Sequence, residues 1–235
     1  VKRIASVSQI IVPFMAVIYI VFVLVLVVCN ITAVPAAFAT IVKAAFSPKA
    51  ITGGAVGSFL VAMQKGVARG IFSNEAGLGS APIAAAAAQT KEPVRQGLVS
   101  MTGTFIDTIV ICTLTGLSIV LTGAWQVDGL EGVQVTTYAF QNGLPFPKEL
   151  SAFVLMLCLV FFAFTTILGW DYYSERCLEY LSGGRMKYVK VYRWIYILAV
   201  FIGPYMTVSA VWTIADIFNG LMALPNMIAL FALSG

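Results

Sequence analysis

The chain has 235 residues and a net charge of +4, with 60% hydrophobic and only 10% charged side chains and a mean hydropathy of +0.95. A soluble domain carries about 25% charged residues, so the composition excludes an ordinary soluble protein and predicts an all-α polytopic membrane protein. The chain has no histidine and no CxxC pair, which excludes Ser-His catalysis, histidine zinc sites and a disulfide framework. We therefore expect that the protein is not an enzyme.

Apolar stretches long enough to cross a bilayer core of about 30 Å recur along the chain. We expect a single transmembrane domain over 1–235 with six spans. In chain order these spans are 9–31, 55–89, 98–121, 151–181, 194–206 and 208–233.

The stretches between the expected spans are shorter and more polar. AVPAAFATIVKAAF (33–46) predicts an interfacial helix, and SPKAITGG (47–54) predicts a turn. Residues 122–150 read as a loop, and SGGRMKYVKVYR (182–193) reads as a connection. The fourth span should continue beyond the bilayer as a polar helix.

Lysine and arginine are unequally divided between the two ends of the expected spans. Nine basic residues flank the side on which the chain begins, namely Lys2, Arg3, Lys91, Arg95, Arg176, Arg185, Lys187, Lys190 and Arg193. Three flank the opposite side, namely Lys43, Lys49 and Lys148. Because cytoplasmic loops carry an excess of positive charge, we expect the N-terminal end of the chain to be cytoplasmic. Membrane orientation accounts for these residues, so we expect no nucleic-acid partner.

The second expected span carries helix-breaking residues at its centre. Its sequence ARGIFSNEAGLGSAPIAAAAA (68–88) contains Gly77 and Gly79, each of which weakens a helix by about 1 kcal/mol relative to alanine. Pro82 suits only the first turn of a helix, and Ser80 is a favourable N-cap. The sequence therefore predicts two half-helices separated by a break.

The predicted break covers about 72–80. The first half-helix should end near Phe72, SNEAGLG (73–79) should be unwound, and the second should start near Ser80 and run through the alanines of 84–88. Irregular backbone at membrane depth is tolerated only where it lines a cavity or is buried in protein. Freed carbonyls suit a cation or an ammonium group, and the second half-helix N-terminus suits an anion. The alternative is a close helix crossing that uses small residues.

Two acidic residues lie in apolar surroundings. Glu75, inside the break, is costly at this depth unless it is paired or hydrogen-bonded. Asp107 lies in the third span, where it could take part in ion coupling or pair with another helix; we favour the pairing role.

The fourth span carries a second polar group in FFAFTTILGWDYYSER (161–176). Hydroxyls such as those of Thr165 and Thr166 are suitable ligands for a hard cation. The alternative is a bond from each hydroxyl to the carbonyl four residues earlier, which is common in membrane helices. Trp170 belongs either to an interfacial aromatic belt or, together with Phe72, to the wall of a small pocket.

The stretch KGVARGIFSNEAGLGSAP (65–82) closely resembles the signature of the alanine/glycine:cation symporter family, the sodium:alanine symporters. The hydrophobic profile on both sides is also similar to the second half of that family. The resemblance implies a leucine-transporter-type fold of two inverted five-helix repeats. On this basis the chain is the C-terminal half of a longer transporter, with the last helix of the first repeat and nearly all of the second.

The resemblance also implies sodium-driven symport of alanine and glycine by alternating access, in the plasma membrane of a prokaryote. The substrate-binding residues would be Phe72, Ser73, Asn74, Ala76, Gly77 and Trp170. Thr165 and Thr166 would bind Na⁺, and Glu75 would have a structural or coupling role. The expected partners are the amino acid, the lipid bilayer and the N-terminal half of the same transporter.

Three other functions remain open on the sequence alone. Proton coupling through Glu75 or Asp107 could replace sodium coupling. A channel would need a continuous polar stripe on several spans, and the third and fifth spans show little of one. A non-transporting membrane subunit is the third alternative.

Overall fold

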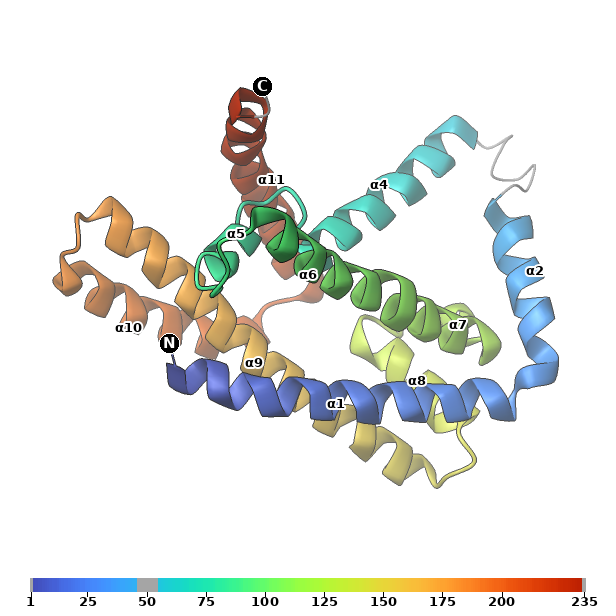
Figure 1. The fold of residues 1–235 in the computed structure, drawn as a ribbon. Coiled ribbons are helices and arrows are strands. Elements are labelled where there is room, and N and C mark those ends of the chain that lie inside the picture. The colour runs from blue at the N-terminus through green and yellow to red at the C-terminus, as the bar shows by residue number, and fades with distance from the viewer. Residues whose placement is uncertain (1, 46–54, 234–235) are drawn as a thin grey trace. The chain divides into compact units, whose positions relative to one another are not determined.

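A computed structural model describes residues 2–45 and 55–233, and the described residues form helices and connecting turns with no strand. Figure 1 traces these elements along the chain. The longer ones are α1 (Lys2–Cys29), α2 (Val34–Ala45), α4 (Ala55–Asn74), α5 (Ala81–Ala85), α6 (Pro93–Phe105), α7 (Thr113–Leu121), α8 (Val133–Gly143), α9 (Lys148–Leu181), α10 (Met186–Ile202) and α11 (Val208–Leu233). Three short 3₁₀ turns, η1 (Ile31–Ala33), η3 (Ala124–Gln126) and η4 (Gly203–Tyr205), and a π-helical segment, η2 (Ile106–Cys112), complete the order. The predicted all-α class is confirmed.

Within the described residues, four helical stretches are long and apolar enough to cross a membrane. They are Ser8–Cys29, Pro93–Leu121, Lys148–Leu181 and Val208–Leu233. At most 11% of the most apolar window of each is buried inside the protein, so these helices present their apolar side chains outward, as lipid-facing or helix-facing spans do. The chain is therefore a multi-pass membrane protein. The spans expected at 55–89 and 194–206 stay predictions.

Two expected element bounds agree with the structure, and one expected segment lies outside it. The interfacial helix expected at 33–46 corresponds to the helix α2, and the polar continuation of the fourth span corresponds to the end of α9. The turn expected at 47–54 lies outside the described residues.

The prediction for the connection at 182–193 was wrong in its length. Gly183 and Gly184 adopt left-handed backbone angles, with φ of 63° and 79°. The amide of Gly184 donates to the carbonyl of Glu179, which ends α9 in the manner of a glycine C-cap. α10 then begins at Met186, because little in the lysine- and tyrosine-containing stretch that follows prevents a helix.

The prediction of a loop over 122–150 was also wrong, because this stretch contains the helix α8. Ala139 and Phe140 on α8 are fully buried, and the ring of Phe140 stacks on that of Tyr19 with a centroid distance of 5.8 Å. Asn30, after α1, donates its amide to the carbonyl of Gly143 at 3.0 Å. The stretch becomes helical because α7 and α1 together supply the surface that buries its apolar side.

The chain divides into two compact units, which are described separately. Unit 1 consists of Val1–Met15, Glu75–Gln96 and Leu159–Gly235. Unit 2 consists of Ala16–Asn74 and Gly97–Cys158.

Unit 2 has its core between α1, α7 and α8. Val23 and Leu26 on α1 are completely buried, as is Phe140 on α8. The hydroxyls of Tyr19 and Thr115 hydrogen-bond at 2.6 Å and link α1 to α7. α7 and α8 lie side by side in Figure 1.

Unit 1 contains a hairpin of the second half of α9 with α10, whose helices lie side by side in Figure 1. Arg193 donates its Nε–H to Oε1 of Glu175 at 2.6 Å, and Glu175 is buried. The hydroxyl of Tyr196 donates to the carbonyl of Ile167 at 2.9 Å. These contacts fix the pairing of the two helices.

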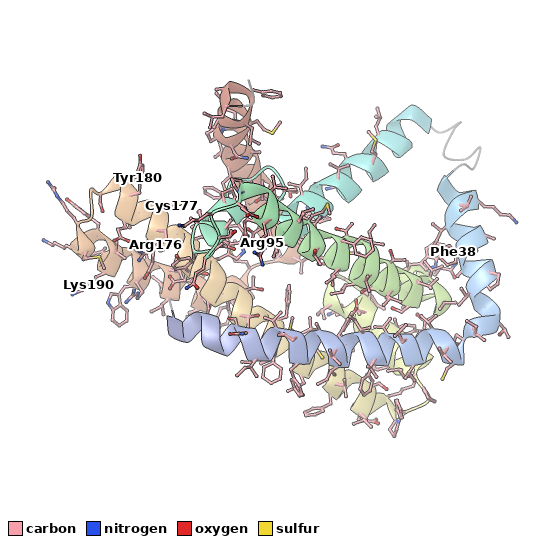
Figure 2. All side chains as sticks on the ribbon, in the orientation of Figure 1. Phe38, Arg95, Arg176, Cys177, Tyr180 and Lys190 are labelled. Carbon is pink, nitrogen blue, oxygen red and sulfur yellow. The ribbon has the colours of Figure 1, made fainter. Side chains whose placement is uncertain are left out.

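The polar end of this hairpin carries charged and aromatic side chains, of which Figure 2 labels Arg176, Tyr180 and Lys190. Arg176 pairs with Glu179 at 2.5 Å and lies over the ring of Tyr172, 5.5 Å from its centroid. Tyr180 is 87% exposed. This mixture of groups suits a helix end that has left the bilayer core.

Gly143 marks the closest approach between α8 and α1. A Cβ at this position would lie 2.8 Å from Cγ of Leu26 and 2.8 Å from Cγ2 of Thr122. We expect Gly143→Ala to destabilise the protein by about 1–3 kcal/mol, because overpacked cores force side chains and backbone to shift. Thermal unfolding of the purified protein in detergent measures this effect. The control is Gly116→Ala on α7, where a Cβ meets nothing within 4 Å; equal melting of the two variants would contradict the prediction.

Candidate functional site

The helix break predicted in the second span is present, two residues later than expected. α4 continues to Asn74, residues 75–80 are not helical, and α5 begins at Ala81. The end of α4 thus lies two residues beyond Phe72, near which it was expected. Side-chain contacts of Ser73 and Asn74 hold the last turn of α4, as described below.

The backbone of the break takes up left-handed angles at every second residue. The φ values are 55° at Glu75, 77° at Gly77 and 81° at Gly79. Among the described residues Glu75 is the only one other than glycine with a positive φ, a conformation that is uncommon for a residue with a Cβ and is typical of functional or strained sites. The amide of Leu78 donates to the carbonyl of Glu75 at 3.3 Å, closing a tight turn. The two glycines thus have a direct conformational role in the break.

The second half-helix differs from the prediction at both ends. Ser80 has helical angles and its hydroxyl makes no capping bond, although the side chain is buried. An N-cap residue needs extended angles for its oxygen to reach back to the backbone, so the predicted cap does not form. α5 ends at Ala85 and does not run through the alanines of 84–88. Beyond its end, the amides of Ala87 and Ala88 each donate to the carbonyl three residues earlier, as in a 3₁₀-helix. A helix of five residues aligns too few peptide dipoles to hold an anion by itself.

In unit 2, the end of α4 is hydrogen-bonded to the π-helical segment η2. Ser73 donates its hydroxyl to Oδ2 of Asp107 at 2.5 Å. Asn74 donates Nδ2 to Oγ1 of Thr108 at 2.7 Å, and the Thr108 hydroxyl donates to Oδ1 of Asn74 at 2.9 Å. The pairing role predicted for Asp107 is present, and its partner is a residue of the family signature.

In unit 1, α11 holds the unwound segment through Asn226. Asn226 donates Nδ2 to the carbonyl of Gly77 at 3.0 Å. A Cβ at Gly79 would lie 3.1 Å from Oδ1 of Asn226, so the side chain also packs on the backbone there. The sequence analysis did not single out Asn226. The signal available was the pair Pro225-Asn226 in the middle of an apolar stretch, where a polar amide needs a partner.

Trp170 lines a cavity of about 490 Å³ beside the C-terminal end of the break. The residues around this cavity include Leu78, Gly79, Ser80, Trp170, Tyr173 and Pro225. The Trp170 ring makes an edge contact with Tyr173 at a centroid distance of 5.8 Å. The walls are mostly apolar, so the cavity suits a small apolar group rather than a charge.

The two threonines proposed as sodium ligands lie on α9 in the same unit. Thr165 is buried and donates its hydroxyl to the carbonyls of Phe161 and Phe162, both at 3.0 Å. Thr166 makes no hydrogen bond to a described residue. Back-bonding uses the proton of a hydroxyl and leaves its oxygen lone pairs available, so Thr165 retains the capacity to bind a cation. Sodium binding by these residues stays a prediction.

The predicted substrate residues fall into both units. The first segment of unit 2 ends with Phe72, Ser73 and Asn74. The second segment of unit 1 begins with Glu75, Ala76 and Gly77. Within unit 1, Trp170 lines the same cavity as residues 78–80, and neither Thr165 nor Thr166 lines it.

Comparison with known proteins gives a consistent result. A model of the sodium:alanine symporter family matches residues 1–235. The chain is 58% identical over 234 residues to an uncharacterised transporter of Haemophilus influenzae, covering 99% of this chain and 50% of the relative. It is 48% identical over 238 residues to the sodium/alanine symporter AgcS of Methanococcus maripaludis, covering 100% and 51%.

A third relative is named for two coupling ions. The putative sodium/proton-dependent alanine carrier protein YrbD of Bacillus subtilis is 39% identical over 249 residues, with 100% of this chain and 50% of the relative covered. The chain spans about half the length of these curated relatives.

The geometry of the break predicts that alanine substitutions at Gly79 and Gly77 reduce the stability of the protein by different amounts. Gly79→Ala should destabilise the protein by about 1–3 kcal/mol, because it places a Cβ at a left-handed φ and against Asn226. Gly77→Ala should cost less, since only Sδ of Met227, at 3.9 Å, is near its Cβ position. Melting temperatures in detergent measure both. Gly103→Ala on α6, where nothing lies within 4 Å, is the control; a Gly79→Ala variant as stable as this control would refute the described backbone.

Proposed function

Because this chain belongs to the sodium:alanine symporter family, we propose that the whole protein containing it carries alanine and glycine across the plasma membrane of a prokaryote, driven by a sodium gradient. No covalent chemistry is involved. The observation that carries the proposal is the helix break at 75–80, at the centre of an expected span. Such breaks are tolerated where they line a binding site.

The amino acid is proposed to bind along the break. Its ammonium group would be received by backbone carbonyls of the segment that includes Ala76 and Gly77. Ser73 and Asn74 would hydrogen-bond the substrate, since the Asn74 amide can make more bonds than the two it makes to Thr108. These are the polar groups that a zwitterion needs.

The apolar side of the substrate is proposed to face Phe72 and Trp170. Bulky walls favour a small side chain such as that of alanine, although discrimination by size is worth only about 1–3 kcal/mol per methylene. The apolar lining beside Trp170 supports this role.

Na⁺ is proposed to bind at Thr165 and Thr166 on α9. Hydroxyl and carbonyl oxygens are suitable ligands for a hard cation and carry no full charge. Glu75 is proposed to hold the unwound segment in shape, since its left-handed backbone lies at the first turn of the break.

The membrane arrangement follows the same proposal. The chain would cross the membrane six times with its N-terminal end in the cytoplasm. It is proposed to pair with the N-terminal half of the same transporter, as its resemblance to the second half of the family implies. The two halves of the site would rock between outward and inward access.

Proton coupling is the second candidate. One relative is described as sodium/proton-dependent, and the chain carries Glu75 and Asp107 in expected spans. Either carboxylate could bind a proton in place of, or in addition to, a sodium ion.

Uptake of labelled alanine separates these candidates. The full-length protein in liposomes should accumulate alanine with an inward sodium gradient and not with an equal potassium gradient at fixed pH. Equal uptake with both ions would reject sodium coupling, and a proton gradient would then be the driving force to test. Uptake of neither alanine nor glycine would reject the proposed substrates.

The proposed sodium site predicts a specific defect in the sodium dependence of uptake. Thr166→Ala should raise the sodium concentration for half-maximal uptake about tenfold, since losing one ligand costs about 1–2 kcal/mol. Thr166→Ser should restore the wild-type value because it keeps the hydroxyl. Thr213→Ala on α11 is the control, because its hydroxyl donates to the carbonyl of Ser209. An unchanged sodium dependence in Thr166→Ala would remove this residue from the site.

A further inference from the structure

The third apolar stretch changes helix type where it meets the end of α4. Its segment η2 (Ile106–Cys112) is π-helical and is flanked by α-helix on both sides. Asp107 and Thr108, consecutive in η2, contact Ser73 and Asn74, which are consecutive at the end of α4. Two neighbouring residues on one segment therefore match two neighbouring residues on the other.

The π geometry favours this match on the η2 side. In an α-helix, adjacent side chains point about 100° apart, so two consecutive side chains diverge as they leave the backbone. A π-helix closes i→i+5 bonds and places more residues in each turn, which narrows this angle. π-helical turns are rare and occur frequently at functional sites. η2 thus allows Asp107 and Thr108 to reach α4 together.

The chemistry of the two contacts differs. The bond from Ser73 to the Asp107 carboxylate has an ionisable acceptor, and such bonds are shorter and stronger than neutral ones. Thr108 uses its one proton on Asn74 and accepts one amide proton in return. Of the four hydrogen-bonding positions of the Asn74 amide, one N–H and one lone pair remain for another partner. The contacts therefore orient the Asn74 side chain and leave its amide able to hydrogen-bond a further partner.

We infer that Asp107 and Thr108 are positioning residues, which hold Ser73 and Asn74 in the orientation in which the break binds the amino-acid substrate. The inference rests on the proposed function, because that function assigns Ser73 and Asn74 to the substrate site. Asp107 and Thr108 act through these two residues and need not touch the substrate. Loss of the Thr108 hydroxyl should weaken substrate binding while leaving the maximal rate of transport nearly unchanged.

Transport kinetics of the full-length protein in liposomes test the inference. Thr108→Val should raise the KM for alanine about tenfold, with a maximal rate within about twofold of the wild type. Thr108→Ser should restore the KM, because it keeps the hydroxyl. The matched control is Thr102→Val, which makes the same chemical change on α6, where the hydroxyl donates only to the carbonyl of Leu98.

A second measurement follows the accessibility of the break by cysteine labelling and does not depend on transport. Ala76→Cys is introduced into a protein in which Cys29, Cys112, Cys158, Cys177 and any cysteine elsewhere are replaced by alanine. Adding Thr108→Val should change the rate of maleimide labelling at position 76 about threefold or more, and adding Thr102→Val should not. Wild-type-like elution from a sizing column confirms that each variant is folded.

Asp107→Asn keeps the inference testable if Thr108→Val does not fold. This variant retains the size of the side chain and an acceptor oxygen but removes the charge, so a KM increase of about threefold is expected.

The outcomes separate the inference from the proposed function. If Thr108→Val and Thr102→Val give the same KM and the same labelling rate, the inference is overturned. If the unmutated protein takes up neither alanine nor glycine while Thr108→Val still changes the labelling, the contact does position the break, and it is the proposed function that fails.

Discussion

A chain that interrupts a helix must satisfy the peptide groups that the interruption releases, and within a bilayer core the lipid would offer them no hydrogen bonds. At the break in this protein, the carbonyl of Glu75 accepts the amide of Leu78, and the carbonyl of Gly77 accepts the side chain of Asn226. The second of these bonds spans 149 residues of sequence. The break is therefore held by a tertiary contact as well as by the local sequence.

The segment that contacts the end of α4 and the helix that contacts the unwound residues are both irregular. Asp107 and Thr108 belong to the π-helical η2, and Asn226 follows Pro225 inside α11. A proline inside a helix removes one backbone bond, and a π-helical turn shifts the register of side chains. Irregular geometry in one stretch is thus accompanied by irregular geometry in the stretches that contact it. In a protein of apolar helices, such positions are where polar side chains can be brought together.

The remaining surface of the helices is apolar and little buried, which distinguishes this chain from a soluble protein of the same length. The apolar windows of the four long helices are between 0% and 11% buried. Between such helices association cannot come from the hydrophobic effect alone, since lipid tails are as apolar as the side chains. Close packing, as at Gly143, and polar links, as between Tyr19 and Thr115, provide specificity within unit 2.

Composition was enough to predict the all-α membrane class, and the stretch 65–82 was enough to predict the family. Gly77, Gly79 and Pro82 were enough to predict the place of the break, because helix-breaking residues act locally. The exact end of α4, the helix α8 and the failure of Ser80 to cap α5 were decided by tertiary structure. The first two depend on partners distant in sequence, since Asp107 and Thr108 contact the last turn of α4 and α7 and α1 bury the apolar side of α8, and the third depends on the helical backbone angles of Ser80. Local propensity contains no information about such partners, which is why the contact of Asn226 with Gly77 could be found only from the folded chain.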